Sequence, residues 1–203
     1  MDPLFAKAVV IGFAIAAPVG PIGLLCIQRT LRGGRAIGLA SGLGAAAADG
    51  VYGAIAGFGV GAITQALLAQ ALWLGVAGGV LLLALGAAAM RRAPVAAAAS
   101  HAGSRAAAFV STFALTLANP MTILSFTAVF ASLGTVATAT TAAALQVVVG
   151  VFLGSAAWWL LLAAVVGGLR AHIGPSALLA INRAAGVVVM LFGVWAIVSA
   201  LSV

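Results

Sequence analysis

The chain has 203 residues, of which 65% are hydrophobic and only 5% are charged. Soluble domains carry roughly 25% charged residues, so this composition excludes an ordinary soluble protein and indicates an integral membrane protein. The net charge of +7 does not indicate nucleic-acid binding, because the basic residues are few and scattered. One cysteine, two histidines and two acidic residues exclude an internal disulfide and are too few for a conventional metal centre, so we expect neither metal nor cofactor.

Apolar stretches long enough to cross a bilayer as helices, about 20 residues each, recur along the chain. We predict an all-α membrane protein with six transmembrane helices, at residues 4–28, 36–61, 66–90, 108–133, 142–169 and 180–201. We expect the first helix to be retained rather than cleaved as a signal peptide. Asp2 precedes it, and its apolar run continues to Ile27.

The basic residues mark one side of the predicted membrane. Eight arginines lie in or next to the first, third and fifth connections: Arg29, Arg32, Arg35, Arg91, Arg92, Arg105, Arg170 and Arg183. The opposite side has only Lys7. By the positive-inside rule the arginine-rich connections lie in the cytoplasm and both termini lie outside, which predicts a multi-pass protein of the cell inner membrane.

This orientation gives the two halves of the chain opposite topology. The first three helices enter the membrane from outside, and the next three enter it from the cytoplasm. We therefore predict two three-helix repeats, residues 1–90 and 108–203, joined by a cytoplasmic linker at 91–107 within one membrane domain. Inverted repeats of this kind are typical of secondary transporters.

Proline interrupts the first helix of each predicted half. Pro18, Gly20 and Pro21 lie in the middle of the first apolar stretch, and Asn119-Pro120 lies in the middle of the fourth. Proline inside a helix removes a backbone hydrogen bond. Broken backbone at membrane depth is tolerated only where protein buries it or where it lines a wet cavity. We therefore predict that helices one and four are both broken near the midplane.

Each predicted break can start a new half-helix. Asparagine is a good N-cap, and proline is favoured at the first helical position. A helix start presents unpaired N–H groups and a positive dipole end, which suits an anion such as an amino-acid carboxylate. We predict that these residues take part in substrate binding: Pro18, Gly20, Pro21, Asn119 and Pro120. The alternative is that the prolines only kink the helices for packing.

Asp49 is the only acidic residue within the predicted helices and lies close to the centre of 36–61. A charge at that depth costs at least about 2.5–3.5 kcal/mol on insertion scales, so it is a functional candidate. Small residues share its helix face at four-residue intervals: Ser41, Ala45, Gly53, Gly57 and Gly61. Such stripes occur where helices approach closely in lipid. We expect Asp49 to face protein or a cavity and to bind the substrate ammonium, carry the coupling proton, or both; the alternative is a protonated carboxyl bonded to nearby backbone.

Three further residues are expected to lie next to the binding residues without contacting the substrate themselves. Tyr52 lies about one turn beyond Asp49, either as its hydrogen-bond partner or as an ordinary packing residue. Thr122 follows the second break, and Trp158 is expected beside the site, with core packing as the alternative role. Arg29 lies at the inner end of the first helix, and we interpret it as interfacial rather than functional.

Two motifs together resemble the lysine-exporter (LysE) family of translocators. The residues concerned are Ala17-Pro18-Val19-Gly20-Pro21, Arg29-Thr30-Leu31-Arg32-Gly33-Gly34-Arg35, Gly44 with Asp49, and Ala118-Asn119-Pro120-Met121-Thr122-Ile123-Leu124. The resemblance covers the whole chain, with both motifs and six helices in register. It implies proton-driven export of amino acids or related small metabolites, not catalysis, and it carries the family's Pro-Gly-Pro, helix-two acid and Asn-Pro over to these positions. One departure is the absence of a second acid, which disfavours lysine and leaves neutral amino acids open.

Two other functions are weighed against this one. An exporter of a metal or other cation, from the same superfamily, is disfavoured by one carboxylate and no paired cysteines. A thiol-transfer electron carrier needs two redox cysteines, and Cys26 is alone. The expected partners are a small zwitterion, protons and the lipid bilayer. Glycine stripes serve contacts within one chain or between two, which leaves a homodimer open.

Overall fold

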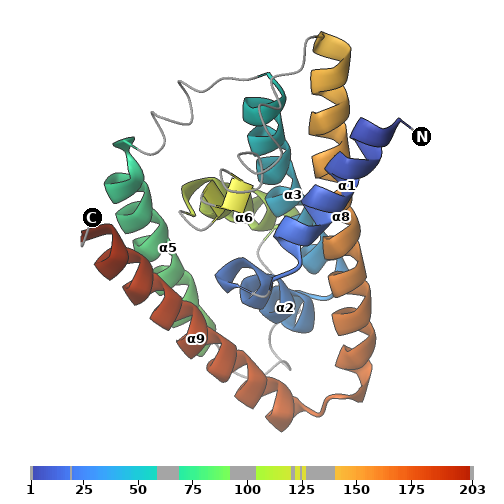
Figure 1. Ribbon diagram of the computed structural model, residues 1–203. Helices are drawn as coiled ribbons and strands as arrows, with labels where there is room; N and C mark the ends of the chain where they lie inside the picture. Colours follow the sequence, from blue (N-terminus) through green and yellow to red (C-terminus); the bar gives the residue numbers. More distant parts are fainter. Residues whose placement is uncertain are drawn as a thin grey trace.

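The computed structural model describes residues 2–18, 20–58, 69–91, 104–119, 122–123, 125–126 and 140–201. Over these ranges the chain is helical and contains no strand, which confirms the all-α class (Figure 1). The helices are α1 (Pro3–Ala16), α2 (Pro21–Gly33), α3 (Arg35–Gly57), α5 (Ala71–Arg91), α6 (Arg105–Ala118), α8 (Thr141–Leu169), the 3-10 helix η2 (Arg170–His172) and α9 (Pro175–Leu201).

Three helices of the described chain are long and apolar enough to cross a membrane: α3, α8 and the Leu179–Leu201 part of α9. The pair α1 and α2 makes a fourth if it is counted as one bent crossing. The apolar helices in α5 and α6 are shorter. Each of the six predicted stretches contains at least one helix, while six membrane crossings stay a prediction.

The chain turns sharply between α1 and α2. Helix α1 ends at Ala16, α2 begins at Pro21, and the two helices are bent by 78° relative to each other. The Gly20 N–H donates to the Pro18 carbonyl at 2.9 Å, which tightens the connection. Pro21 occupies the first position of α2, where a missing N–H leaves no helical bond unmade. As a result α2 runs across the molecule instead of continuing α1 (Figure 1).

A second interruption follows α6. The helix ends at Ala118, and Asn119 has extended backbone angles of φ −80° and ψ 111°. The Asn119 carbonyl accepts hydrogen bonds from the N–H groups of Thr122 and Ile123 at 3.0 and 3.2 Å, so helical bonding resumes directly after it. This interruption coincides with the predicted Asn-Pro break, although Pro120 itself lies outside the described residues.

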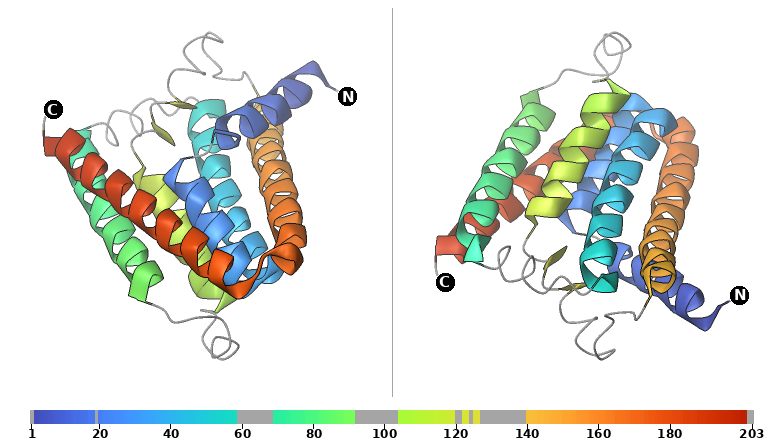
Figure 2. Two further views of the ribbon diagram at one scale, coloured as in Figure 1. Left: turned by 90° about the horizontal axis from the view of Figure 1, so that it is seen from below. Right: turned by 90° about the horizontal axis from the view of Figure 1, so that it is seen from above.

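The helices form two groups with α2 between them (Figures 1 and 2). In the first group α8 packs against α1 and α3, and α6 packs against α3; in the second, α5 pairs with α9. Glycines permit the close approaches. A Cβ atom on Gly154, Gly44, Gly79 or Gly193 would overlap the backbone of the opposing helix. Helix packing therefore depends on small residues, as expected in lipid.

The predicted small-residue face of the second span is buried in the structure. Ser41, Ala45, Asp49, Gly53 and Gly57 are all buried on α3. The last member of that stripe, Gly61, lies outside the described residues. Asp49 is thus surrounded by packed helices and not by lipid, as the stripe predicts.

Candidate functional site

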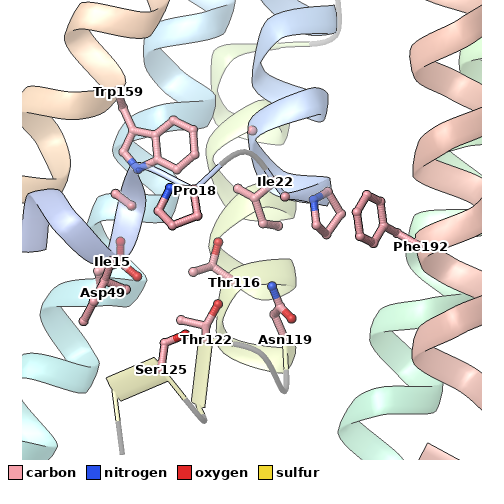
Figure 3. A pocket seen from close by; sticks show the side chains of 14 residues that line it. Ile15, Pro18, Ile22, Asp49, Thr116, Asn119, Thr122, Ser125, Trp159 and Phe192 are labelled. Atoms are coloured by element: carbon pink, nitrogen blue, oxygen red, sulfur yellow. The ribbon is translucent and has the colours of Figure 1, made fainter. Parts of the chain in front are cut away.

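A cavity of about 270 Å³ lies beside both helix interruptions (Figure 3). Its lining comes from α1, α2, α3, α6, α8, α9 and the segments after α1 and α6: Ile15, Ala16, Pro18, Gly20, Pro21, Ile22, Gly23, Asp49, Thr116, Asn119, Thr122, Ser125, Trp159 and Phe192. The structure therefore brings together every predicted binding residue except Pro120, which lies outside the described ranges.

The cavity has a polar side and an apolar side. Thr116, Thr122, Ser125 and Asn119 lie together along α6 and the segment that follows it (Figure 3). Pro18, from the connection between α1 and α2, and Ile22, from the start of α2, face them, and Phe192 of α9 closes another side. Such a lining suits a small molecule that has both charged and apolar groups.

Asp49 is the acidic side chain of the cavity. Its side chain is only 3% exposed. One carboxylate oxygen, Oδ2, accepts a hydrogen bond from Ser155 Oγ at 2.6 Å, and Ser155 Oγ accepts one from Trp159 Nε1 at 3.1 Å. This chain of two bonds fixes the orientation of the carboxyl group from α8, since Ser155 lies 106 residues further along the chain than Asp49.

The start of α2 supplies hydrogen-bond donors. Gly20 is the N-cap, and no side chain caps the helix. Pro21 has no N–H, so the first donors of the helix belong to Ile22 and Gly23, which line the cavity and have no intrahelical acceptor. A Cβ atom on Gly20 would meet nothing within 4 Å, so the space beside this helix start is open. The positive end of α2 is therefore accessible to an anion.

A comparison with known families identifies this architecture. Residues 13–200 match the family model of LysE type translocators. The chain belongs to the LysE type translocator family. No curated protein and no solved structure matches it.

The family match confirms the resemblance seen in the sequence. The chain is a multi-pass membrane protein that exports small molecules, and its family is one of translocators and not of enzymes. The cavity that joins Asp49 to the start of α2 is therefore the candidate site for the molecule that this translocator moves.

Thr116 is a cavity residue of the translocator that sequence reasoning missed. Its side chain is 4% exposed, and its hydroxyl oxygen has no hydrogen-bond partner among the residues that the structure describes. A buried hydroxyl without a partner is rare in native proteins and costs free energy. The available signal was its position three residues before Asn119, which places both on one face of α6.

Tyr52 bonds to backbone and packs on an aromatic ring, which agrees with the second of its two predicted roles. Its hydroxyl donates to the Leu117 carbonyl at 2.7 Å, and its ring stacks on Phe126 with centroids 5.1 Å apart. Tyr52 therefore ties α3 to the end of α6 and supports the second interruption. Thr122 belongs to the segment that follows this interruption, and it lines the cavity.

The two adjacent tryptophans of α8 have different surroundings. Trp158, which was expected beside the site, packs edge-on against Phe13 of α1 with ring centroids 5.5 Å apart. Trp159 lines the cavity instead and donates to Ser155. Successive residues on a helix point about 100° apart, so only one of the pair can face the cavity.

Arg29, interpreted from the sequence as interfacial, contacts two neighbouring helices in the translocator. It is half-buried and donates four hydrogen bonds. Its Nη1 donates to Ser41 Oγ at 3.2 Å, to the Ala108 carbonyl at 3.0 Å and to Thr112 Oγ1 at 2.7 Å, and its Nη2 donates to Ser111 Oγ at 2.8 Å. The guanidinium thus connects α2 to α3 and α6.

Proposed function

We propose that the translocator exports amino acids or related small metabolites from the cytoplasm in exchange for protons. One observation carries this proposal: a single small cavity contains both the carboxylate of Asp49 and the uncapped start of α2. The ammonium group of an amino acid binds Asp49, and its carboxylate binds the N–H groups of Ile22 and Gly23.

The size and charge of the cavity limit the substrate. Its volume of about 270 Å³ lies below the roughly 300–1,000 Å³ of sites for drug-sized ligands, which fits a small metabolite. Its one acidic residue, Asp49, balances one ammonium group. A neutral amino acid fits this charge count better than a dibasic one, and Phe192 and Ile22 offer apolar surface to its side chain.

Proton exchange follows from competition at one carboxyl group. Asp49 binds either a proton or an ammonium ion, and binding of one weakens binding of the other. A proton that arrives from the outer side therefore displaces the substrate, and a substrate that arrives from the cytoplasm displaces the proton. Intramembrane carboxyl groups are common members of such proton relays.

Helix packing supports the inverted repeat of the two halves. The predicted repeat makes α1 equivalent to α6, α3 to α8 and α5 to α9. Under this equivalence the α1–α8 contact corresponds to the α6–α3 contact, and the α3–α8 and α5–α9 contacts each correspond to themselves. These are the helix pairs that pack most closely in the structure. Alternating access then consists of one half rocking against the other around the cavity.

Two of the arginine-rich connections, those after α2 and after α8, meet on one side of the described part of the chain, which supports six crossings with both termini outside. Arg170, at the end of α8, donates from Nη2 to the Arg32 carbonyl at the end of α2, at 3.1 Å. Helices from different halves thus end together at this side. A periplasmic reporter enzyme fused to the C-terminus tests the orientation, and we expect it to be active; an inactive reporter would reverse the assigned sides.

Transport by purified protein in liposomes tests the function. The lumen is loaded with one labelled compound at a time, from a panel of neutral, acidic and dibasic amino acids and the cadmium ion, and a pH gradient is applied. We expect gradient-dependent movement of neutral amino acids with matching proton flux, reported by a trapped dye. Movement of cadmium without any amino acid would favour the cation exporter, and movement without proton flux would remove the coupling.

A further inference from the structure

Arg29 joins the two halves of the translocator through neutral groups alone. It belongs to α2 and donates to Ser41 on α3 within the first half, and to Ala108, Ser111 and Thr112 on α6 in the second half. The shortest of these bonds, at 2.7 Å to Thr112 Oγ1, crosses between the halves. Any motion that separates α2 from α6 must break these bonds.

Arg29 lies between the cavity and the arginine-rich side of the molecule. On α2, Ile22 lines the cavity, Cys26 follows one turn later, and Arg29 lies almost one further turn along the same face. Cys26 is 2% exposed and packs in one buried cluster with Ala45 and Leu115. Apolar side chains thus seal the cavity on this side, and Arg29 lies behind the seal.

Helices α3 and α6 show the same succession, from a cavity residue to an acceptor of Arg29. On α3, Asp49 lines the cavity, and Ser41, an Arg29 acceptor, lies about two turns nearer the arginine-rich end. On α6, Thr116 lines the cavity, and Thr112, another acceptor, lies one turn nearer that end. The same three helices therefore carry the cavity wall, the apolar seal and the Arg29 bonds in succession.

The charge of Arg29 has no carboxylate among its acceptors. All four acceptors are hydroxyl or carbonyl oxygens, and the chain has only two acidic residues, Asp2 and Asp49, neither of which accepts from Arg29. Hydrogen bonds from a guanidinium to a carboxylate are stronger than those to neutral oxygens and are often bidentate. A carboxylate that reaches Arg29 therefore competes well with the α6 acceptors.

We infer that Arg29 closes the cytoplasmic entrance of the cavity, and that it opens this entrance by exchanging its α6 acceptors for the carboxylate of the outgoing molecule. The identity of the ligand and the side of the membrane rest on the proposed function; the closure itself rests on the bonds of Arg29 and the buried seal. Arg29 is thus a positioning residue for export, which it controls through the access of substrate to the cavity.

The only cysteine of the chain provides the test. Cys26 lies in the seal, so its rate of alkylation by N-ethylmaleimide in membrane vesicles reports opening of this entrance. We expect slow alkylation in the wild type and roughly tenfold faster alkylation in Arg29→Gln, the change that loss of one charge-assisted hydrogen bond produces. Arg105→Gln removes the same charge from an exposed site and is the matched control, with the wild-type rate expected. Wild-type rates in Arg29→Gln would overturn the closure.

A second variant covers the case in which Arg29→Gln fails to fold. Ser111→Ala combined with Thr112→Val removes both α6 hydroxyl acceptors, keeps the charge of Arg29, and is expected to speed alkylation of Cys26 as well. Melting temperatures in detergent, measured for every variant, separate opening of the entrance from general unfolding. Slow alkylation in a folded double variant would show that these bonds do not hold the entrance shut.

The exchange of acceptors is tested with ligands in the wild type. A mixture of neutral amino acids is expected to speed alkylation of Cys26, whereas the matching amino-acid amides, which lack the carboxylate, are expected to leave it unchanged. In Arg29→Gln neither mixture should have an effect. Equal rates with acids and amides would overturn the role of the carboxylate. Fast alkylation in the Arg29 variants together with no amino-acid transport in liposomes would keep the closure and reject the proposed function.

Discussion

Asp49 and Arg29 are opposite charges in the interior of the same helix bundle, and the structure holds them in different ways. Asp49 receives one hydroxyl hydrogen bond, from Ser155, and borders a cavity. Arg29 makes four hydrogen bonds to α3 and α6 and does not line that cavity. The carboxyl group of Asp49 faces the cavity, while the guanidinium of Arg29 is hydrogen-bonded to neighbouring helices.

This contrast separates two uses of a buried charge. A carboxylate beside a cavity has capacity left for a ligand, whereas a guanidinium that bonds across helices fixes their relative position. Changes at Asp49 should therefore remove transport and leave the fold intact. Changes among the partners of Arg29 should alter stability and access to the cavity, and should affect substrate binding less.

The largest effect is expected for Asp49→Asn. Export should fall at least about 100-fold, because the substrate ammonium and the proton both lose their acceptor, and truncation of a buried charge pair costs about 2–5 kcal/mol. The melting temperature in detergent should stay the same or rise, since an intramembrane charge is itself costly. Transport in liposomes under a pH gradient measures the effect.

Asp2→Asn is the matched control for that substitution. Asp2 is exposed and caps α1 by accepting from the Leu4 N–H at 2.9 Å, a role that asparagine also fills. Its export rate should equal that of the wild type. Undiminished export by Asp49→Asn would show that this carboxylate takes no part in transport. The functional contrast between Asp49 and Arg29 would then be wrong.

The next largest effect is expected for Ser155→Ala. This change removes the hydroxyl that donates to Asp49 at 2.6 Å, and hydrogen bonds to charged groups contribute about 1.5–3 kcal/mol, so transport should fall by at least about tenfold. Trp159→Phe removes only the donor to Ser155 and keeps the aromatic ring, so it should have a smaller effect. A larger loss in Trp159→Phe than in Ser155→Ala would mean that the indole, and not the carboxyl group, is what this chain of bonds positions.

Much of the cavity was predictable because its residues obey strong local rules. Proline disfavours helix inside an apolar run, and α1 and α6 end close to the positions predicted for the interruptions, at Ala16 and Ala118. An acid within an apolar stretch must face protein, and the small residues around Asp49 showed which face that was. These inferences need only neighbouring residues.

Arg29 and Trp159 were missed because their roles depend on how whole helices are oriented. The sequence places Arg29 at the inner end of the broken first span but does not give the angle of the break. The 78° bend turns α2 across the molecule, so that Arg29 meets α3 and α6. Helix α8 is apolar on all sides, so no pattern fixes which face meets the cavity, and the prediction chose Trp158 instead of Trp159.

A matched pair of threonines on α6 comes next, because one valine variant is expected to lose stability moderately and the other is not. Thr112 and Thr116 are both buried and lie one turn apart. Thr112 Oγ1 accepts from Arg29, whereas Thr116 Oγ1 has no partner within the described ranges of the chain. Replacement by valine keeps the shape. Thr112→Val should lower stability by about 1–3 kcal/mol, because it takes an acceptor from a charged group. Thr116→Val should be neutral or stabilising and should weaken substrate binding. Reversed effects on the melting temperature would contradict the assigned bonding.

The smallest effect is expected for Tyr52→Phe, which tests a neutral bond between the same two helices. The Tyr52 hydroxyl donates to the Leu117 carbonyl at 2.7 Å, close to the end of α6, where carbonyl groups lack helical partners. Phenylalanine keeps the stacking on Phe126, so only this bond is lost, at a cost of about 0.5–1.5 kcal/mol. Thermal unfolding in detergent should show this loss, while export should stay close to wild type because no charge near the cavity changes. A strong loss of export with unchanged stability would instead assign the phenolic hydroxyl to substrate or proton transfer, and Asp49 would no longer act alone.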